Sequence, residues 1–493
     1  MPEIQNPMTS SFRPRLAALA LASLTFLGGC ASLAPTYERP AAPVPTQLGE
    51  AAAEAPAVPV ADLGWQAFFA DARLQQAIEL ALRNNRDLRI AALNIERARG
   101  LYGVQSADTL PSVGVAAGEN AQRVPSDLST TGQGRVTRQY SATLGFSAYE
   151  LDLFGRVRSL REASLQQVFA TEAARRTTHI GLVSQVAGSW LTLAADRARL
   201  ELAQATLKSQ GDTLRLTERR HELGVSSDLD VQRARTTVES ARADVARYAG
   251  QVQADLQALQ LLLGAPLPPE AMPGTEATAL AFAPLPAGLG SEVLLQRPDV
   301  MQAERDLQAA NATIGAARAA FFPRISLTAS VGTASSSLSG LFGAGSGIWS
   351  FVPQLALPIF DNGRNRSNLQ VAQADRDIRV AAYERSIQAA FREVADGLSQ
   401  RQSLVEQLAA QRALEEAASR AQFLSQARFE RGVDDFLSVL DAQRSLYAAQ
   451  QGRISTALAQ QLNAVTLYKA LGGGWEATTR TAAAGDTPAA VAR

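Results

Sequence analysis

A short chain-reversal motif occurs twice in this sequence, 208 residues apart. The first copy reads Gly-Val-Ser-Ser-Asp-Leu-Asp-Val at 224–231, and the second reads Gly-Val-Asp-Asp-Phe-Leu-Ser-Val at 432–439. The same offset carries Gly264 onto Gly472, each after a leucine. A duplicated unit of this length indicates two copies of one structural repeat, which constrains the fold more than any single residue does.

Long segments without proline lead into each motif, at 155–223 and 363–431. We predict both as helices that could reach on the order of 100 Å, followed by return helices to Leu263 and Leu471. A further helix is expected over 74–103, where apolar residues recur at steps of three and four. Coiled-coil spacing of seven residues is present in the first long segment. The residues on that spacing are Val186, Leu193, Leu200, Leu207 and Leu214.

Two shorter segments, one in each repeat, alternate apolar residues with small or polar ones. They are predicted β-hairpins at about 111–152 and 323–360, with loops at 126–134 and 333–347. Each strand is about ten residues long, which is the length of a tilted transmembrane strand. One face would be apolar with aromatic residues, and the other would suit a wet lumen.

Four strands cannot close a barrel, and open sheet edges are not tolerated in lipid. If these strands cross a membrane, several chains must therefore share one barrel. A closed barrel needs at least about eight strands, so a modest number of chains is enough. Three chains would contribute about twelve strands.

The N-terminus has the pattern of a secretory signal. Arg13 and Arg15 precede an apolar run at 16–27, which is too short to span a bilayer. The sequence Leu-Gly-Gly-Cys follows, and its cysteine, Cys30, is the only one in the chain. This resembles a lipoprotein signal peptide over 1–29 with Cys30 as the acylated residue, and several acyl chains would anchor the protein firmly.

The composition divides the remainder into five segments. Residues 30–64 are a Pro/Ala-rich leader, 65–264 the first repeat, 265–296 a connector with little regular structure, 297–474 the second repeat, and 475–493 a disordered tail.

With these features together, the chain resembles the TolC-like outer-membrane factors, and most closely their lipid-anchored OprM-type branch. The resemblance covers nearly the whole folded chain and recurs in both halves. The motifs that carry it are Leu-Gly-Gly-Cys at 27–30, Trp65 with Phe68, Ala-Leu-Arg-Asn-Asn-Arg-Asp-Leu at 81–88, Tyr-Glu-Leu-Asp-Leu-Phe-Gly-Arg at 149–156, Arg-Pro-Asp-Val at 297–300, Ala-Arg-Ala-Ala-Phe-Phe-Pro at 317–323, Leu-Pro-Ile-Phe-Asp-Asn-Gly-Arg at 357–364, and Phe-Leu-Ser-Val-Leu-Asp-Ala-Gln-Arg-Ser at 436–445.

The resemblance implies a mainly α-helical protein with a membrane β-barrel. It implies a homotrimer in which four strands per chain build a twelve-stranded barrel, above a periplasmic tunnel of helical hairpins. Such a trimer is the passive exit duct of a tripartite efflux system in the outer membrane, and contributes to drug resistance. Its partners would be a periplasmic adaptor protein, an inner-membrane transporter and outer-membrane lipid. The alternatives are the exit duct of a type I protein secretion system and a non-conducting coiled-coil envelope lipoprotein.

By position, the resemblance assigns a periplasmic gate to Leu437, Asp441 and Arg444. Three copies of Asp441 around one axis would form a carboxylate ring, a cation-selective device. The plainer interpretation is an Asp441–Arg444 pair on a solvated helix face. Many relatives carry a second acidic residue where this chain has Ser438, which argues against a double acidic ring. The residues expected to contact the adaptor at the two tips are Gly224, Val225, Gly432 and Val433.

The remaining patterns exclude other classes of function. The formal net charge is zero, so no nucleic-acid partner is indicated. His179 and His221 are isolated and lack metal-ligand spacing. No nucleophile motif stands out. We therefore expect no enzyme activity, no catalytic residue, no cofactor and no metal site.

Overall fold

The computed structural model describes residues 32–48, 60–130, 132–276, 280, 282–285 and 289–475. The predicted signal peptide, Cys30 and the tail beyond Trp475 lie outside these ranges. The chain divides into two compact units. The first contains residues up to 40, 95–171 and 303–383, and the second contains 41–94, 172–302 and 384–493.

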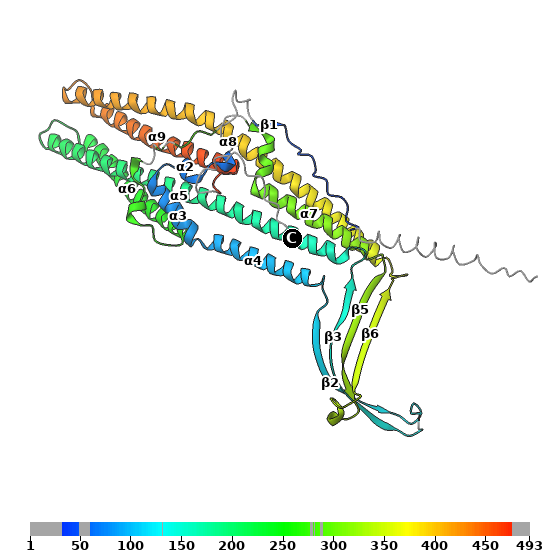
Figure 1. Cartoon of the computed structure of the whole chain (residues 1–493). Helices are drawn as coiled ribbons and strands as arrows, with labels where there is room; N and C mark the ends of the chain where they lie inside the picture. Colours follow the sequence, from blue (N-terminus) through cyan, green and yellow to red (C-terminus); the bar gives the residue numbers. More distant parts are fainter. Residues whose placement is uncertain are drawn as a thin grey trace, which may run out of the picture. The chain divides into compact units, whose positions relative to one another are not determined.

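The first unit contains a four-stranded antiparallel sheet in the order β2-β3-β5-β6 (Figure 1). This confirms the two predicted hairpins and joins them through β3 and β5. β2 and β6 are the two edges of the sheet. The strands are β2 (Val113–Val124), β3 (Arg135–Leu151), β5 (Arg324–Ser335) and β6 (Gly347–Ala356).

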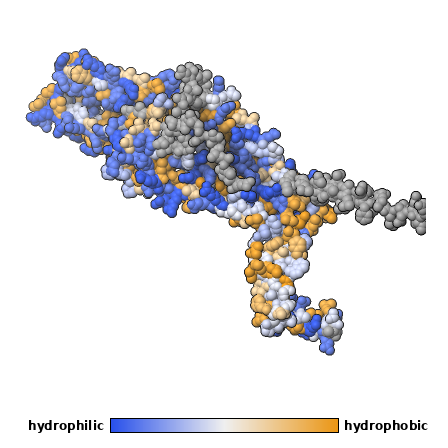
Figure 2. Space-filling view, in the orientation of Figure 1, coloured by the Kyte–Doolittle hydropathy of each residue, from blue (hydrophilic) through white to orange (hydrophobic). Residues whose placement is uncertain are grey.

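The strand register gives the sheet two chemically different faces. Leu144 lies opposite Val331, which lies opposite Trp349, so these apolar side chains share one face. Ser330 and Ser350 pair on the other face. Trp349 is 79% exposed in the single chain, and Figure 2 shows hydrophobic residues over much of the sheet. The alternation predicted from the sequence is confirmed, and the apolar face is suited to lipid.

β3 is longer than the ten residues expected and contains an irregularity. Its register with β5 shifts between Phe146 and Tyr149, and Ala148 takes a φ of 53°. Just before the shift, a Cβ on Gly145 would lie 2.1 Å from the carbonyl oxygen of Ala329. Glycine is therefore required there by the close approach of two backbones.

The long predicted helices are confirmed within a residue at each end. Each pair forms an antiparallel hairpin around one of the duplicated turns. The helices are α5 (Arg156–Glu222), α6 (Asp228–Leu263), α8 (Arg364–Glu430) and α9 (Phe436–Ala470). On the heptad positions of α5, Val186 and Leu193 are fully buried, whereas Leu214 near the tip is only half-buried. Every helix within the described ranges is too short or too polar to cross a bilayer.

The single helix predicted over 74–103 is wrong. The structure has α3 (Ala72–Asn84) and α4 (Arg86–Ala107), separated at Asn85. Asn85 takes an extended conformation, its side-chain oxygen accepts the backbone N–H of Leu88, and its amide donates to the carbonyl of Leu262. The periodicity continues through the break, so the pattern alone could not reveal this cap.

The connector is more regular than predicted. It contains the 3-10 helices η2 (Pro269–Ala271) and η4 (Ser291–Gln296), and the short strand β4 (Leu289–Gly290). β4 pairs with β1 (Gln47–Leu48) of the leader. The indole of Trp190 donates to the carbonyl of Ala271 at 2.9 Å, which fixes the connector onto α5.

The aromatic core of the second unit packs around α2 (Trp65–Phe68). The rings of Phe68 and Tyr468 are stacked with centroids 4.0 Å apart. Nearby, Arg297 is buried and donates to the carboxylates of Asp299 and Glu393. Arg297 also donates to the carbonyl of Ala470 at 2.7 Å, so it connects α9, α8 and α7 (Pro298–Ala319) within this unit.

The leader begins the folded structure well before Trp65. Within the first unit, the carbonyls of Leu33 and Pro35 accept hydrogen bonds from α7. Further along, Tyr37 and Arg39 both donate to the buried carboxylate of Glu304. Burial and the Glu304 carboxylate raise the pKa of Tyr37 to about 12. The leader is therefore a docked extended segment rather than a free linker.

Candidate functional site at the hairpin tips

Both duplicated turns close their helices in the same way. At the first tip, Val225 N donates to the Arg220 carbonyl, and Gly224 N donates to the His221 carbonyl. The second tip repeats this pattern, because Val433 N donates to the Arg428 carbonyl. These are Schellman motifs, which require a left-handed residue after the helix. Gly224 and Gly432 both have a φ of 73°.

The start of each return helix is capped by a different residue type. Ser227 forms a capping box with Asp230 at the start of α6. Asp435 caps α9 by accepting the backbone N–H of Ser438 at 3.1 Å. Ser438 also donates its hydroxyl to Asp435, so this position supports the cap.

Asp434, the residue before this cap, pairs with Arg428. The guanidinium makes two hydrogen bonds to its carboxylate, at 2.6 and 2.7 Å, and lowers the pKa of Asp434. The two valines that follow the turn glycines remain well exposed, at 64% for Val225 and 61% for Val433. The tips therefore combine a fixed backbone with an apolar side chain open to contact.

A small apolar cluster joins the two hairpins just above the tips. Phe436, Val439 and Leu440 of α9 are buried against Ala234 of α6. Leu214 and Phe429 pack around this cluster. The guanidinium of Arg220 lies 4.7 Å from the Phe429 ring centroid, which adds a cation–π contact between α5 and α8.

Next to this cluster lies a cleft of about 410 Å³ between α5, α6 and α9. Polar side chains bridge the hairpins along it. Tyr447 of α9 donates its hydroxyl to Asp244 Oδ2 of α6 at 2.9 Å. Gln210 of α5 donates to Gln443 of α9 at 3.0 Å. Burial and the Asp244 carboxylate raise the pKa of Tyr447 to about 12, so the phenol remains a donor at neutral pH.

The three predicted gate residues lie on one stretch of α9. Leu437, 41% exposed, and Arg444 both line the cleft. Asp441 is exposed, and its Oδ1 lies 3.6 Å from Arg444 Nη1. In the single chain, Asp441 and Arg444 therefore form the i,i+3 surface pair that was expected from the sequence as the plainer alternative to a gate. Such a pair is worth little by itself, so Asp441 is available to other partners.

Sequence reasoning missed Tyr447 and Asp244. Their contact joins helices of different repeats, 203 positions apart, and neither residue belongs to the duplicated motif. Tyr447 lies one helical turn beyond Arg444, so extending the predicted site along the same face would have included it. Nothing in the sequence singles out Asp244.

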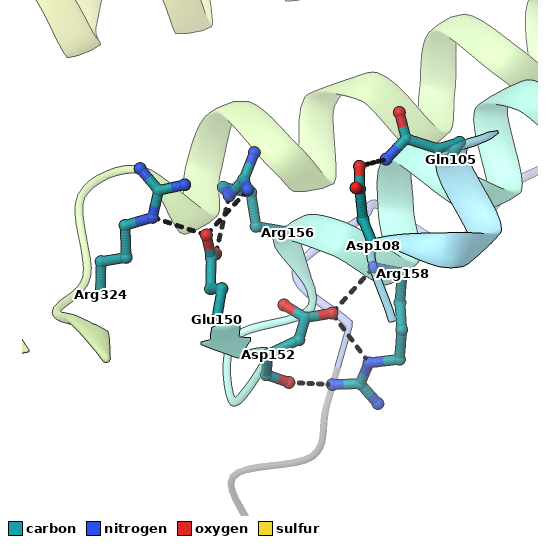
Figure 3. A network of polar contacts seen from close by, with 7 residues as sticks. All are labelled: Gln105, Asp108, Glu150, Asp152, Arg156, Arg158 and Arg324. Carbon is teal, nitrogen blue, oxygen red and sulfur yellow. Dashed lines mark hydrogen bonds and ion pairs between the residues drawn. The ribbon is translucent and has the colours of Figure 1, made fainter. Parts of the chain in front are cut away.

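A second polar network lies in the first unit, where the strands meet the helices (Figure 3). The carboxylate of Glu150 accepts two hydrogen bonds from Arg156 at 2.8 Å and one from Arg324 at 2.5 Å. Asp152 pairs with Arg158 at 3.3 Å. These contacts bind the ends of β3 and β5 to the first turn of α5.

Comparison with known proteins is consistent with this architecture. The family described as "Outer membrane efflux protein" matches residues 77–265 and 289–473. The "Probable efflux pump outer membrane protein TtgC" of Pseudomonas putida is 48% identical over 462 residues, covering 93% of this chain and 95% of that protein. The outer membrane protein OprJ of Pseudomonas aeruginosa is 45% identical over 465 residues, covering 94% and 97%.

Solved structures agree. The open state of the Neisseria gonorrhoeae MtrE outer membrane channel superposes with a TM-score of 0.84 at 39% identity, covering 92% of this chain and all of that one. A CusC structure superposes with a TM-score of 0.81 at 42% identity, covering 90% of this chain and all of the CusC chain. The four strands are thus part of an outer-membrane β-barrel and the hairpins part of a helical tunnel that extends into the periplasm, and this chain belongs to the outer membrane efflux protein family.

Proposed function

We propose that this chain forms a homotrimeric exit duct whose periplasmic end opens and closes at the hairpin tips. The observation that carries the proposal is the inter-hairpin cleft. Beside the exposed Leu437, the hydrogen bond from Tyr447 to Asp244 is one of the polar bridges there and holds α9 against α6. Three chains would supply twelve strands and satisfy both edges of each sheet. They would also bring six hairpin tips around one opening.

In this proposal the second hairpin carries the gate. Three copies of Leu437 would form an apolar constriction, and three copies of Asp441 a carboxylate ring. Arg444, which reaches Asp441 within one chain, could exchange that partner for a neighbouring copy when the tips close. Ser438 serves the α9 cap, so a second acidic ring is not part of the proposal.

The partners follow from this assignment. A periplasmic adaptor would contact the rigid Gly-Val tips through Val225 and Val433, and an inner-membrane transporter would supply substrate through it. Several relatives are described as toluene, solvent or antibiotic efflux proteins. We infer small apolar or amphipathic organic molecules as the exported class. These names favour efflux over protein secretion and over a non-conducting lipoprotein.

Planar-bilayer conductance of the purified protein tests the gate. We expect low conductance from the wild type, and higher conductance from both Leu437→Ala and Asp441→Ala. The matched control is Leu229→Ala, because Leu229 holds the equivalent position in the first repeat and is 57% exposed. Equal conductance of Leu437→Ala, Asp441→Ala and the wild type would contradict the assignment of the gate residues. If neither the wild type nor any variant conducts, the proposal that the protein is a duct is wrong.

A further inference from the structure

The two repeats begin their long helices with the same basic pattern. Arg156 and Arg158 start α5, and Arg364 and Arg366 occupy the positions 208 residues later at the start of α8. In the first repeat both arginines are paired with acidic residues, Arg156 with Glu150 and Arg158 with Asp152 (Figure 3).

The second repeat lacks these acidic partners. The positions equivalent to Glu150 and Asp152 are Pro358 and Phe360. In the single chain, Phe360 is 85% exposed, and the adjacent Ile359 is 93% exposed. The start of the second long helix thus presents apolar side chains where the first presents carboxylates.

The charge of this surface is correspondingly unbalanced. Arg364 and Arg366 are exposed, and among the described residues their side chains form no ion pair or hydrogen bond. Asp361, three positions before Arg364, accepts the backbone N–H groups of Gly363 at 3.0 Å and Asn365 at 2.9 Å. Asp361 is therefore engaged with the backbone, and two guanidinium groups remain available beside exposed aromatic and aliphatic side chains.

This surface lies at the level of a membrane interface. β6 ends at Ala356, and the apolar face of the sheet, which includes Leu355, extends from there along the strand. A cavity of about 630 Å³ adjoins the strand end. Its lining combines apolar residues that include Leu357 with the charged residues Glu150, Asp152, Arg156, Arg324 and Arg364. Since the sheet spans the hydrocarbon layer, the segment where strands become helices falls among lipid headgroups.

From this juxtaposition we propose that the surface formed by Ile359, Phe360, Arg364 and Arg366 binds an anionic phospholipid of the periplasmic leaflet. The guanidinium groups contact the lipid phosphate, because arginine matches phosphate geometry and charge. Phe360 and Ile359 insert beside the acyl chains. The first repeat has no such site, because its arginines are neutralised within the chain. The inference concerns the membrane boundary and does not depend on the gate at the tips.

Native mass spectrometry of the full-length protein, titrated with dioleoyl phosphatidylglycerol, tests the proposal. Each basic residue near an anionic lipid surface contributes about a fivefold factor, so Arg364→Gln with Arg366→Gln should weaken binding about 25-fold. The control variant, Arg385→Gln with Arg412→Gln, removes two exposed arginines further along α8. It should bind as the wild type does. Unchanged affinity in the Arg364/Arg366 variant would overturn the proposal.

Two further arms separate the sources of binding. Inorganic phosphate should not displace the lipid at equal concentration, and full displacement would identify a phosphate site in place of a lipid site. In vesicles of phosphatidylglycerol brominated near the headgroup, Phe360→Trp should add a quenched tryptophan signal to that of the wild type. An added but unquenched signal would mean that a neighbouring copy covers this surface, and would also overturn the proposal.

Discussion

Replacing Tyr447 by phenylalanine should shift the periplasmic end of the channel from the closed state towards the open state. The substitution removes the hydroxyl that donates to Asp244 and keeps the ring. Asp244 is not left unpaired, since Arg247 lies 2.8 Å from its carboxylate. A hydrogen bond to a charged group contributes about 1.5–3 kcal/mol, and this half-buried one belongs at the lower end. We therefore expect a loss of about 1.5 kcal/mol of closed-state stability per chain.

The proposed trimer multiplies this effect. If opening requires all three chains to move, three lost bonds amount to about 4.5 kcal/mol, or roughly a thousandfold shift from closed to open. The bond also predicts a pH dependence. The pKa of Tyr447 is raised from 10 to about 12, so its contribution is present below pH 10 and is lost as the pH rises through 12.

Single-channel recording in planar bilayers measures the open probability directly. Tyr447→Phe should raise it strongly. Tyr248→Phe, which removes a bond to the neutral amide of Gln451 at 3.1 Å, should raise it less. Tyr102→Phe lies outside the hairpin cleft and serves as the control. An open probability for Tyr447→Phe equal to that of Tyr102→Phe would show that the bridge does not hold the closed state.

Two further substitutions test other parts of the structure. Gly145→Ala should lower the yield of heat-resistant oligomer on gels, because its Cβ would meet the Ala329 carbonyl within the chain, and an unchanged yield would contradict this. Asp255→Asn should raise the melting temperature at pH 7.5 and leave it unchanged near pH 3. Burial and the Asp196 carboxylate raise the pKa of Asp255 from 3.8 to about 6. The contribution of this carboxyl to wild-type stability is therefore fully present below pH 3.8 and is lost as the pH rises through 6. An equal effect of Asp255→Asn at both pH values would contradict this.

Most of the fold could be predicted because its signals are local and repeated. Alternation over ten residues gave the strands, and the absence of proline over nearly seventy gave α5 and α8. The left-handed glycine that each turn needs was visible as Gly224 and Gly432. The break at Asn85 was hidden, since a capping asparagine leaves the helical periodicity around it intact.

The candidate site was harder to predict because its contacts join different repeats. Leu437, Asp441 and Arg444 could be named from resemblance, but which groups oppose them could not. The partner of Tyr447 is set by how α9 lies on α6, which depends on the apolar packing of Phe436 and its neighbours. Long-range pairings of this kind leave no mark in a single sequence.

Comparison of the two repeats with each other points to where function lies. The shared glycines fix a common backbone, so positions at which the copies differ are free of that constraint. At the tips, the first repeat has Arg233 at the position equivalent to Asp441, and Glu239 at the position equivalent to Tyr447. At the strand ends, Asp152 is replaced by Phe360. Each difference changes charge or apolar character at an exposed or cleft-lining position, where packing does not require it. In our proposal, duplication allowed one copy to maintain the wall while the other acquired the gate residues and a lipid-facing surface.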